Sequence, residues 1–498
     1  MVDGGGGHDN ESWGVETDAK ILINKTKIDY RQFLAHMQKF DSIIVGAGSA
    51  GCLLADRLAA DRSRQVLVIE PSSAPANEND RRRPSHWLNL LGSSDDWDYS
   101  TEATSSLSGR SLRWPRGRGM GGSGRINAMI WFPPTQADIA NLADCLGRDV
   151  GEVRDAFERA QSIVQPEPAK WHSSAAQRFL STAKEFAGIP VSYQRVNRNG
   201  RRWTPAGLLD RPNIQVVRAT ADRVLFSGDR ATGIRTAEGE EIQSAEHVYL
   251  CAGAIATPMI LMRSGIGPID VLSTCDIEVR INAPAVGANL QDHLIMPVVF
   301  GVKSEHAFGP IPSEADVQTW EATGDGPVAS NIAEVGGLFD DDQIQIHVTP
   351  THYLLYPNLK APPAMTIGVN LTQPQSRGRL TITSADPHAP PRIEPNYLAT
   401  EYDLQKTIEG VRLARQIAAS DCFANIITGE LLPGTKRESD ESIAKSVQRF
   451  SQTLYHPVGT AAGIDTGCEN LRIVDASVLK QITVGNPNAA VMTLAMLG

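Results

Sequence analysis

The stretch that decides the fold is FDSIIVGAGSAG at residues 40–51, followed by VLVIE at residues 66–70. A strand rich in Ile and Val runs into the motif G-x-G-x-x-G, and a helix rich in Ala and Leu follows, a pattern typical of a dinucleotide-binding βαβ unit. Gly46 makes the tight turn, Gly48 lets backbone N–H groups approach a pyrophosphate, and Gly51 allows close packing of helix and strand. We therefore expect a pyrophosphate at the N-terminus of this helix, where the helix dipole favours an anion.

Glu70 comes 19 residues after Gly51, near the spacing at which an acidic residue accepts hydrogen bonds from a ribose. Strand, glycine motif, helix and acid occur in the expected order, which supports a bound dinucleotide more strongly than the glycines alone. The residues predicted to contact it through this unit are Gly46, Ala47, Gly48, Ser49, Ala50, Gly51 and Glu70.

The composition is that of a globular protein with more than one core. The 498 residues suit two or three interleaved domains, and 41% are hydrophobic while 21% are charged. The 47 basic and 57 acidic residues give a net charge of −10 without a long basic block, which argues against a nucleic-acid partner. The short run Arg81–Arg83 is expected in a solvated loop. No apolar run reaches the length of a membrane span, so we predict a soluble, cytoplasmic protein without a membrane partner.

The cysteines show neither a metal-binding nor a disulfide pattern. None of the six lies in a C-x-x-C motif, and their spacing matches no metal site, so we predict buried free thiols, a reducing compartment and no bound metal. They are Cys52, Cys145, Cys251, Cys275, Cys422 and Cys468.

A second glycine cluster, RGRGMGGSG at residues 116–124, suits close approach of the backbone to a planar or phosphorylated ligand, or else forms a flexible loop. Residues 1–38 are expected to be a flexible tail and lead-in. Periodicity and turn signals predict the other elements. These are a helical segment at 136–163, a hairpin around Gly228-Asp229, a strand at 247–254 that leads into a helix, a β-rich region at 297–392 and a helix at 402–419.

Five ordered motifs in the chain resemble those of the glucose–methanol–choline (GMC) oxidoreductases, from about residue 40 to the end. The closing NPN at 486–488 is most similar to choline oxidases. The motifs are the first glycine motif with Glu70, RGMGG at 118–122, AGAIATP at 252–258 with SGIGP at 264–268, GANLQDH at 287–293 and HPVGT at 456–460.

The resemblance implies an α/β fold in which a Rossmann-like FAD-binding domain is interleaved with a mixed-sheet α+β substrate domain. Residues 39–134, 205–296 and 455–498 would form the FAD-binding domain. Residues 135–204 and 297–454 would form the substrate domain. The implied activity is FAD-dependent oxidation of a small-molecule alcohol to a carbonyl, with oxygen or another compound as electron acceptor.

The resemblance also implies roles for individual residues. His456 matches the histidine that takes the alcohol proton while hydride passes to flavin N5, and Asn486 matches the second active-site position. These residue types suit the roles, because histidine titrates near neutral pH and asparagine hydrogen-bonds an alkoxide without competing for its proton. His347 is a candidate substrate contact. Glu334 either binds a cationic or hydroxylated substrate or braces the sheet, and His293 is expected to be structural.

Further positions match flavin or adenosine contacts of the family. They are Trp97, Gly119, Met120, Gly121, Gly122, Asn127, Ala128, Met129, Val224, Cys251, Ala252, Asp475, Ala476, Pro487 and Asn488. Relatives that tether the flavin use a histidine immediately before the asparagine of the glycine-rich motif. Ile126 stands there in this chain, so we predict non-covalent FAD.

Two departures from the family pattern are the shortened segment between Thr460 and Leu471, expected to open the region behind His456, and the early end of the last helix at Gly498, expected to reflect truncation. The sequence leaves the substrate, the acceptor and the oligomeric state open. Two alternatives are a lyase that holds FAD on the same scaffold without net redox, as in cyanohydrin-cleaving members, and a flavin-bearing binding protein.

Overall fold

The computed structural model describes residues 20–23, 26–29, 40–71, 81–309, 311–358 and 360–498, in two compact units. In the first unit, β1 (Lys20–Ile23) pairs antiparallel with β2 (Thr26–Asp29). The part of the expected tail that the structure describes therefore forms strands, and the rest of the tail lies outside the described residues. The second unit comprises Phe40–Gly498.

The predicted βαβ unit is confirmed. Strand β3 (Phe40–Val45) runs parallel to β4 (Val66–Ile69), and α2 (Ser49–Leu58) connects them. Every residue of β4 is buried, as expected for a parallel strand covered on both faces. These strands belong to a seven-stranded sheet with the order β12-β4-β3-β15-β14-β13, in which β26 also pairs with β15.

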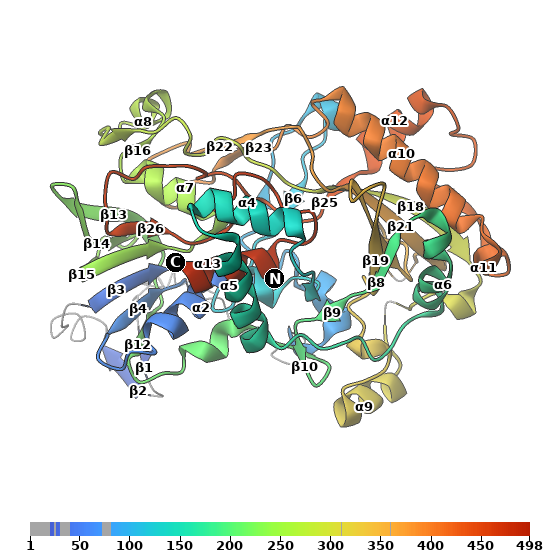
Figure 1. The fold of residues 1–498 in the computed structure, drawn as a ribbon, viewed down its shortest axis with the longest axis horizontal. Coiled ribbons are helices and arrows are strands. Elements are labelled where there is room, and N and C mark those ends of the chain that lie inside the picture. Colours follow the sequence, from blue (N-terminus) through green and yellow to red (C-terminus); the bar gives the residue numbers. More distant parts are fainter. Residues whose placement is uncertain (1–19, 24–25, 30–39, 72–80, 310, 359) are drawn as a thin grey trace, which may run out of the picture. The chain divides into compact units, whose positions relative to one another are not determined.

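The long strand β15 (Glu241–Leu250) joins distant parts of the chain in this first sheet (Figure 1). It runs parallel to β3 and to β26 (Leu471–Ile473), and antiparallel to β14 (Arg230–Thr236). The hairpin predicted around Gly228-Asp229 is formed by β14 and β13 (Ala221–Ser227), while β12 (Ile214–Val217) closes the other edge. The sheet thus gathers the N-terminal, central and C-terminal segments of the unit.

Helices from both ends of this unit share one core with the first sheet. Helix α13 (Asn488–Leu497) packs against α2 and against α5 (Val150–Val164), whose buried face consists of small residues such as Ala156 and Ala160. Helix α4 (Gln136–Leu146) joins the same core. The expected helical segment at 136–163 is therefore two helices, separated at Gly147, and it packs with the dinucleotide-binding sheet rather than with a substrate domain.

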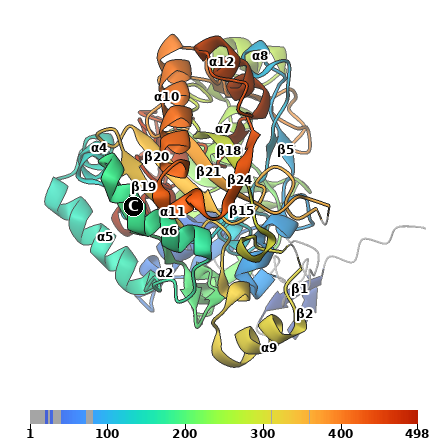
Figure 2. The same ribbon diagram turned by 90° about the vertical axis from the view of Figure 1, so that its right-hand side faces the viewer.

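The second sheet has seven strands in the order β24-β18-β21-β20-β19-β8, with β25 also paired to β18 (Figure 1). Its pairings are antiparallel, and one face packs on α10 (Glu401–Ala418), as Figure 2 shows. The strand bounds are β8 Ile189–Ser192, β18 Leu294–Val302, β19 Val335–Phe339, β20 Ile344–Thr349, β21 Ala364–Leu371, β24 Ile427–Leu432 and β25 Gln452–Thr453.

Helix α10 approaches the second sheet closely because it carries a glycine at the contact. A Cβ added to Gly410 would lie 2.1 Å from Cγ1 of Val369. Helix α6 (Ser174–Thr182) packs on the same face, so residues 135–204 are divided between the two cores. The division into an FAD-binding and a substrate domain stays a prediction. Within it, α4 and α5 pack on the core of the first sheet, whereas α6 packs on the core of the second sheet.

Shorter elements complete the described fold. The remaining α-helices are α7 Gly253–Arg263, α8 Ile269–Thr274, α9 Glu314–Thr323, α11 Asp421–Ala424 and α12 Asp440–Phe450. The short strand pairs are β5 Tyr99–Ser100 with β6 Arg113–Trp114, β7 Ile130–Trp131 with β9 Gln194–Arg195, β10 Asn197–Arg198 with β11 Arg201–Arg202, β16 Ile266–Gly267 with β17 Ile281–Asn282, and β22 Arg379–Thr381 with β23 Arg392–Glu394.

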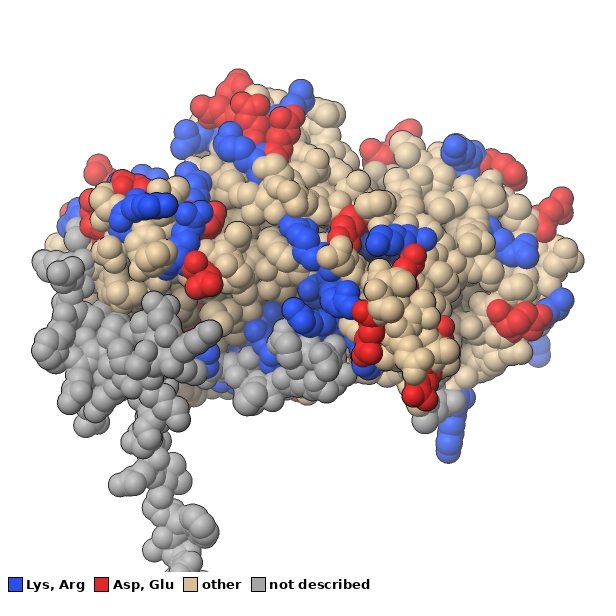
Figure 3. Space-filling model, turned by 90° about the horizontal axis from the view of Figure 1, so that it is seen from below, with Lys and Arg blue, Asp and Glu red and all other residues tan. Residues whose placement is uncertain are grey.

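Charges of both signs are spread over the face drawn in Figure 3, where the largest group of basic side chains lies near the centre. The prediction that Arg81–Arg83 is a solvated run is wrong for Arg81, whose guanidinium pairs with both carboxylate oxygens of Asp95 at 2.5 and 2.9 Å. Asp95 has no exposed side-chain surface, so this pair is an internal anchor. None of the helices described is both long and apolar enough to cross a bilayer. All six cysteines are free.

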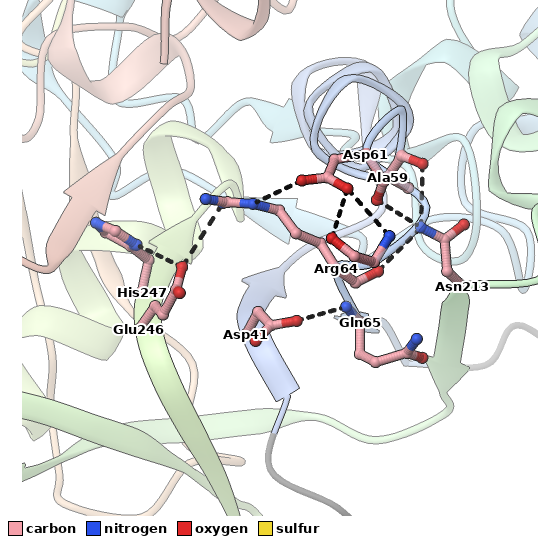
Figure 4. A network of polar contacts seen from close by, with 9 residues as sticks. Asp41, Ala59, Asp61, Arg64, Gln65, Asn213, Glu246 and His247 are labelled. Carbon is pink, nitrogen blue, oxygen red and sulfur yellow. Dashed lines mark hydrogen bonds and ion pairs between the residues drawn. The ribbon is translucent and has the colours of Figure 1, made fainter.

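A network at one end of the first sheet ties β12 to the loop between α2 and β4 (Figure 4). The buried Asn213 amide donates hydrogen bonds to the carbonyl oxygens of Ala59, Asp61 and Arg64 at 3.0, 3.1 and 2.9 Å. The Arg64 side chain instead reaches Asp61 and Glu246 at 3.8 and 3.7 Å across a half-exposed surface. The Asn213 amide thus supplies hydrogen-bond donors to three carbonyl groups of the loop, whereas the ion pairs of the Arg64 side chain are long and lie at the surface.

We expect Asn213→Ala to lower the free energy of unfolding by about 1–3 kcal/mol, because buried carbonyl groups lose their donors. The control Arg64→Ala keeps its own carbonyl and removes only exposed ion pairs, so its change should stay within about 0.5 kcal/mol. Denaturant unfolding of both variants checks this. Equal losses in the two variants would contradict the role given to Asn213.

Candidate active site

A continuous cavity runs from the glycine loops of the first sheet to one face of the second sheet. Many of the predicted site residues line it, and they come from widely separated parts of the chain. They are Gly46, Gly48, Ser49, Ala50, Glu70, Trp97, Gly122, Asn127, Ala128, Met129, Cys251, Ala252, Asp475, Ala476, Pro487, Asn488, His347, His456 and Asn486. Residues predicted for the site that do not line the cavity are Ala47, Gly51, Gly119, Met120, Gly121, Val224 and Glu334.

The two glycine loops meet backbone to backbone. A Cβ added to Gly122 would lie 2.7 Å from Cα of Gly48, and one added to Gly51 would lie 1.9 Å from the carbonyl oxygen of Gly46. A Cβ on Gly48 itself would meet no atom closer than 4.0 Å. The second cluster is therefore part of the cradle, and Gly48 leaves open space for a ligand where a side chain would stand.

Glu70 links these loops. Its carboxylate accepts hydrogen bonds from the backbone N–H of Ala47 at 2.7 Å and of Gly119 at 2.8 Å, one to each oxygen. Burial raises the pKa of Glu70 to about 7, although the two N–H donors oppose that shift. Because each carboxylate oxygen has two lone pairs, these bonds leave capacity for the predicted ribose contact. The sequence pointed to the ribose contact and missed the link between the loops.

Helix N-termini supply the polar part of this end. Each of α4, α5, α6, α9, α10 and α12 has an N-cap side chain that accepts a backbone hydrogen bond. The N-cap residues of α2, α7 and α13 make no such bond, and all three helices begin at the cavity. Asp475 binds the first N–H of α7, at Gly253. Uncapped N–H groups at α2 and α13 fit a pyrophosphate.

At the other end, the two predicted catalytic side chains are in contact. The Asn486 amide nitrogen lies 3.2 Å from Nε2 of His456, and Nδ1 of His456 lies 3.0 Å from Nδ1 of His293. Nε2 of His293 lies 2.7 Å from the carbonyl oxygen of Thr372. His293 is therefore part of a relay of hydrogen bonds behind His456, a role that its place in the GANLQDH motif signalled but did not define.

This relay determines which nitrogen of His456 carries the proton. A carbonyl only accepts, so His293 must donate from Nε2, and its neutral ring then accepts at Nδ1. His456 must accordingly donate from Nδ1, which leaves the lone pair on Nε2. That nitrogen faces the Asn486 amide, a donor, and both residues line the cavity. The tautomer is the one a general base requires.

All three clustered histidines are held neutral. Burial, together with His293, His347 and Arg116, lowers the pKa of His456 well below its usual value. Burial lowers the pKa of His293 to about 4 and that of His347 to about 3. An uncharged His456 is able to accept a proton across the neutral pH range.

Asp292 holds the backbone at His456. Its carboxylate accepts hydrogen bonds from the His456 N–H and the Thr453 hydroxyl, both at 2.6 Å, and from the Tyr397 hydroxyl. Tyr455, just before His456, has a φ of +66°, a strained conformation that such anchoring sustains. Asp292 lies in the GANLQDH motif, but the motif alone did not reveal its contact with His456.

The loop that carries Asn486 is anchored separately. Gln291 accepts from the Ile482 N–H at 3.2 Å and donates to the Lys480 carbonyl at 3.0 Å. Asp138, at the start of α4, accepts from the Val484 N–H at 2.9 Å. The motif residue Gln291 thus helps to position the segment that carries Asn486.

Of the remaining candidate residues, His347 lies in the cavity wall, whereas Glu334 and Val224 do not line the cavity. His347 lines the cavity, with Nδ1 3.0 Å from the Tyr193 hydroxyl and Nε2 without a protein partner. Glu334 is fully buried and accepts hydrogen bonds from Ser173 and Ser330, which supports the bracing alternative. The N–H of Val224 donates to the Ser264 hydroxyl.

We predict that the acid limb of the kcat/KM profile lies below pH 6.5, the ordinary histidine value. With a lowered pKa, His456 stays unprotonated as the pH falls through 6.5, and the base is lost only in more acidic solution. Initial rates between pH 5 and pH 8, with circular dichroism at each pH as a control for folding, check this. An acid limb at or above pH 6.5 in folded protein would contradict it.

Family models match two long stretches of the chain. Family models described as GMC oxidoreductase match residues 40–213 and 201–295 for the N-terminal part and 374–495 for the C-terminal part. An alcohol dehydrogenase [acceptor] from Pseudomonas putida is 31% identical, over 92% of this chain and 94% of the relative. An oxygen-dependent choline dehydrogenase from Stenotrophomonas maltophilia is 32% identical, over 92% and 93%.

Solved structures show the same fold. Pyridoxine 4-oxidase from Mesorbium loti aligns with a TM-score of 0.81 and 27% identity, over 92% of this chain and 98% of that one. A formate oxidase from Aspergillus oryzae RIB40 aligns with a TM-score of 0.84 and 23% identity, over 92% and 97%. The expected Rossmann-like α/β fold is thereby confirmed.

Proposed function

Because the chain belongs to the GMC oxidoreductase family, we propose that it oxidises an alcohol to a carbonyl, with FAD in this cavity and His456 as the general base. The observation that carries the proposal is the contact, at the cavity, between Nε2 of His456 and the Asn486 amide nitrogen, together with the lowered pKa that keeps the His456 ring neutral. The names of the relatives favour redox chemistry over the lyase alternative.

The cavity residues fit FAD. Uncapped N–H groups at α2 and α13 would bind the pyrophosphate, Glu70 would bind a ribose, and the open space beside Gly48 would admit the cofactor. When bound, FAD supplies the acceptor for the hydride that leaves the carbinol carbon. Oxygen or another compound would then reoxidise the enzyme.

The chain's own residues handle the proton. Nε2 of His456 takes the proton of the alcohol hydroxyl, while the Asn486 amide donates a hydrogen bond to the oxygen on which negative charge develops. His293 keeps Nδ1 of His456 protonated, so that Nε2 remains the acceptor. Asp292 fixes the main chain of His456, whose ring lines the cavity.

His456→Ala should lower the rate of flavin reduction by alcohol about 10²- to 10⁴-fold and retain bound FAD, because only the base is lost. The measurement is anaerobic bleaching of the flavin spectrum with a panel of alcohols. His388→Ala, which changes an exposed histidine outside the cavity, is the matched control and should be unaffected. Near-normal bleaching in His456→Ala would contradict the assignment of His456 as the base. Absence of bleaching in the wild-type protein would favour the lyase or the flavin-bearing binding protein.

We further propose that FAD is held without a covalent bond. Ile126, buried at the cavity wall immediately before Asn127, has no nucleophile. His86, the only histidine of the predicted segment 39–134, does not line the cavity. Acid precipitation should leave the yellow chromophore in the supernatant, and the intact mass of the denatured chain should show no FAD adduct. Flavin that remains with the pellet would refute this proposal.

A further inference from the structure

One end of the cavity is formed by the second sheet and the segment before His456, and we call it the substrate end. His347 lies opposite Gly368, and Thr349 opposite Thr366, in the pairing of β20 with β21, so these residues form one patch on the sheet face. The residues of the substrate end are Ile295, His347, Thr349, Tyr353, Thr366, Gly368, Leu454 and Tyr455.

The polar groups of the substrate end are uncharged. The Thr366 hydroxyl donates to the Thr351 carbonyl at 2.8 Å, and burial with the neighbouring Tyr455 holds the pKa of Tyr353 well above its usual value. The ring of His347 is neutral, and its Nε2 has no protein partner. A substrate therefore meets neutral hydrogen-bonding groups and apolar walls here.

No carboxylate of the described cavity lining lies at the substrate end. The acidic residues of that lining are Glu70 and Asp475. Both belong to the dinucleotide end, where Glu70 binds Ala47 and Gly119, and where Asp475 accepts from the Gly253 N–H at 2.9 Å and the Thr257 hydroxyl at 2.6 Å.

The charges nearest the substrate end offer a cation no free carboxylate. Glu334 is turned into the protein and engaged with Ser173 and Ser330. Asp292 is buried outside the cavity lining and accepts hydrogen bonds from the His456 N–H and from the Thr453 and Tyr397 hydroxyls. Arg116 lines the cavity and donates to the Tyr455 carbonyl at 2.5 Å, which places a positive charge close to the substrate end. A quaternary ammonium has no hydrogen to donate to these groups, so it would lose its hydration without gaining a carboxylate partner in return.

We propose that this site takes uncharged alcohols and discriminates against quaternary ammonium alcohols such as choline. The inference rests on the proposed alcohol oxidation and adds its substrate class. It separates this chain from those relatives whose names state choline as substrate.

The test compares choline with 3,3-dimethylbutan-1-ol, which has the same shape but carbon in place of the charged nitrogen. In the holoenzyme, kcat/KM for the neutral alcohol should exceed that for choline by about 100-fold or more, the scale set by leaving a charge unpaired in a buried site. If neither compound reduces the flavin, saturable perturbation of the flavin spectrum reports binding of each. The proposal is overturned if the neutral alcohol has neither a higher kcat/KM nor tighter binding than choline. Absence of flavin reduction by any alcohol instead counts against the proposed oxidation.

A variant pair probes the missing charge directly. Ile295, buried in the wall of the substrate end, is replaced in Ile295→Glu and in the neutral control Ile295→Gln. The preference for the neutral alcohol should fall by about tenfold or more only in the glutamate variant, since it alone supplies a counter-charge. An equal change in both folded variants would overturn the electrostatic explanation, and the wild-type comparison decides the proposal if either variant fails to fold.

Discussion

The structure of the site depends on the carboxylate of Glu70, which binds the backbones of both glycine loops. Through Ala47 it holds the turn between β3 and α2, and through Gly119 it holds the second glycine cluster. The loops approach so closely that a side chain at Gly122 would strike Gly48. An acidic residue and two side-chain-free positions therefore create one cradle from two glycine loops that are more than 70 residues apart in the sequence.

The chemical end depends on a second short segment. Gln291, Asp292 and His293 are consecutive, yet each acts on a different part of the site. Gln291 anchors the loop that leads to Asn486, Asp292 anchors the backbone of His456, and His293 selects its tautomer. Because β18 begins directly after them, the same segment connects the proposed catalytic groups to the second sheet. Residues from the last tenth of the chain are thereby held next to the cavity wall that the second sheet forms.

Much of this could be predicted from the sequence, where the physics is local. The strand, glycine motif and helix of the βαβ unit, and the turn at Gly228-Asp229, follow from periodicity and from backbone conformations that favour glycine. The packing of residues 136–164 on the first core could not be predicted, because amphipathic helices do not specify which apolar surface covers them. The anchoring of Arg81 was missed for a similar reason, since its partner Asp95 is brought near by folding.

The sequence by itself determined that this chain binds a dinucleotide on a Rossmann-like unit and carries the motifs of an alcohol-oxidising family, because those signals depend on residue type and spacing. Only the tertiary structure decided which polar groups face the cavity. Glu334 was open between binding and bracing, and its burial among serines supports bracing, while His347 remains in the cavity wall. The direction of a side chain depends on the strand register and on its long-range partners. The spacing of residues along the sequence carries no information about either.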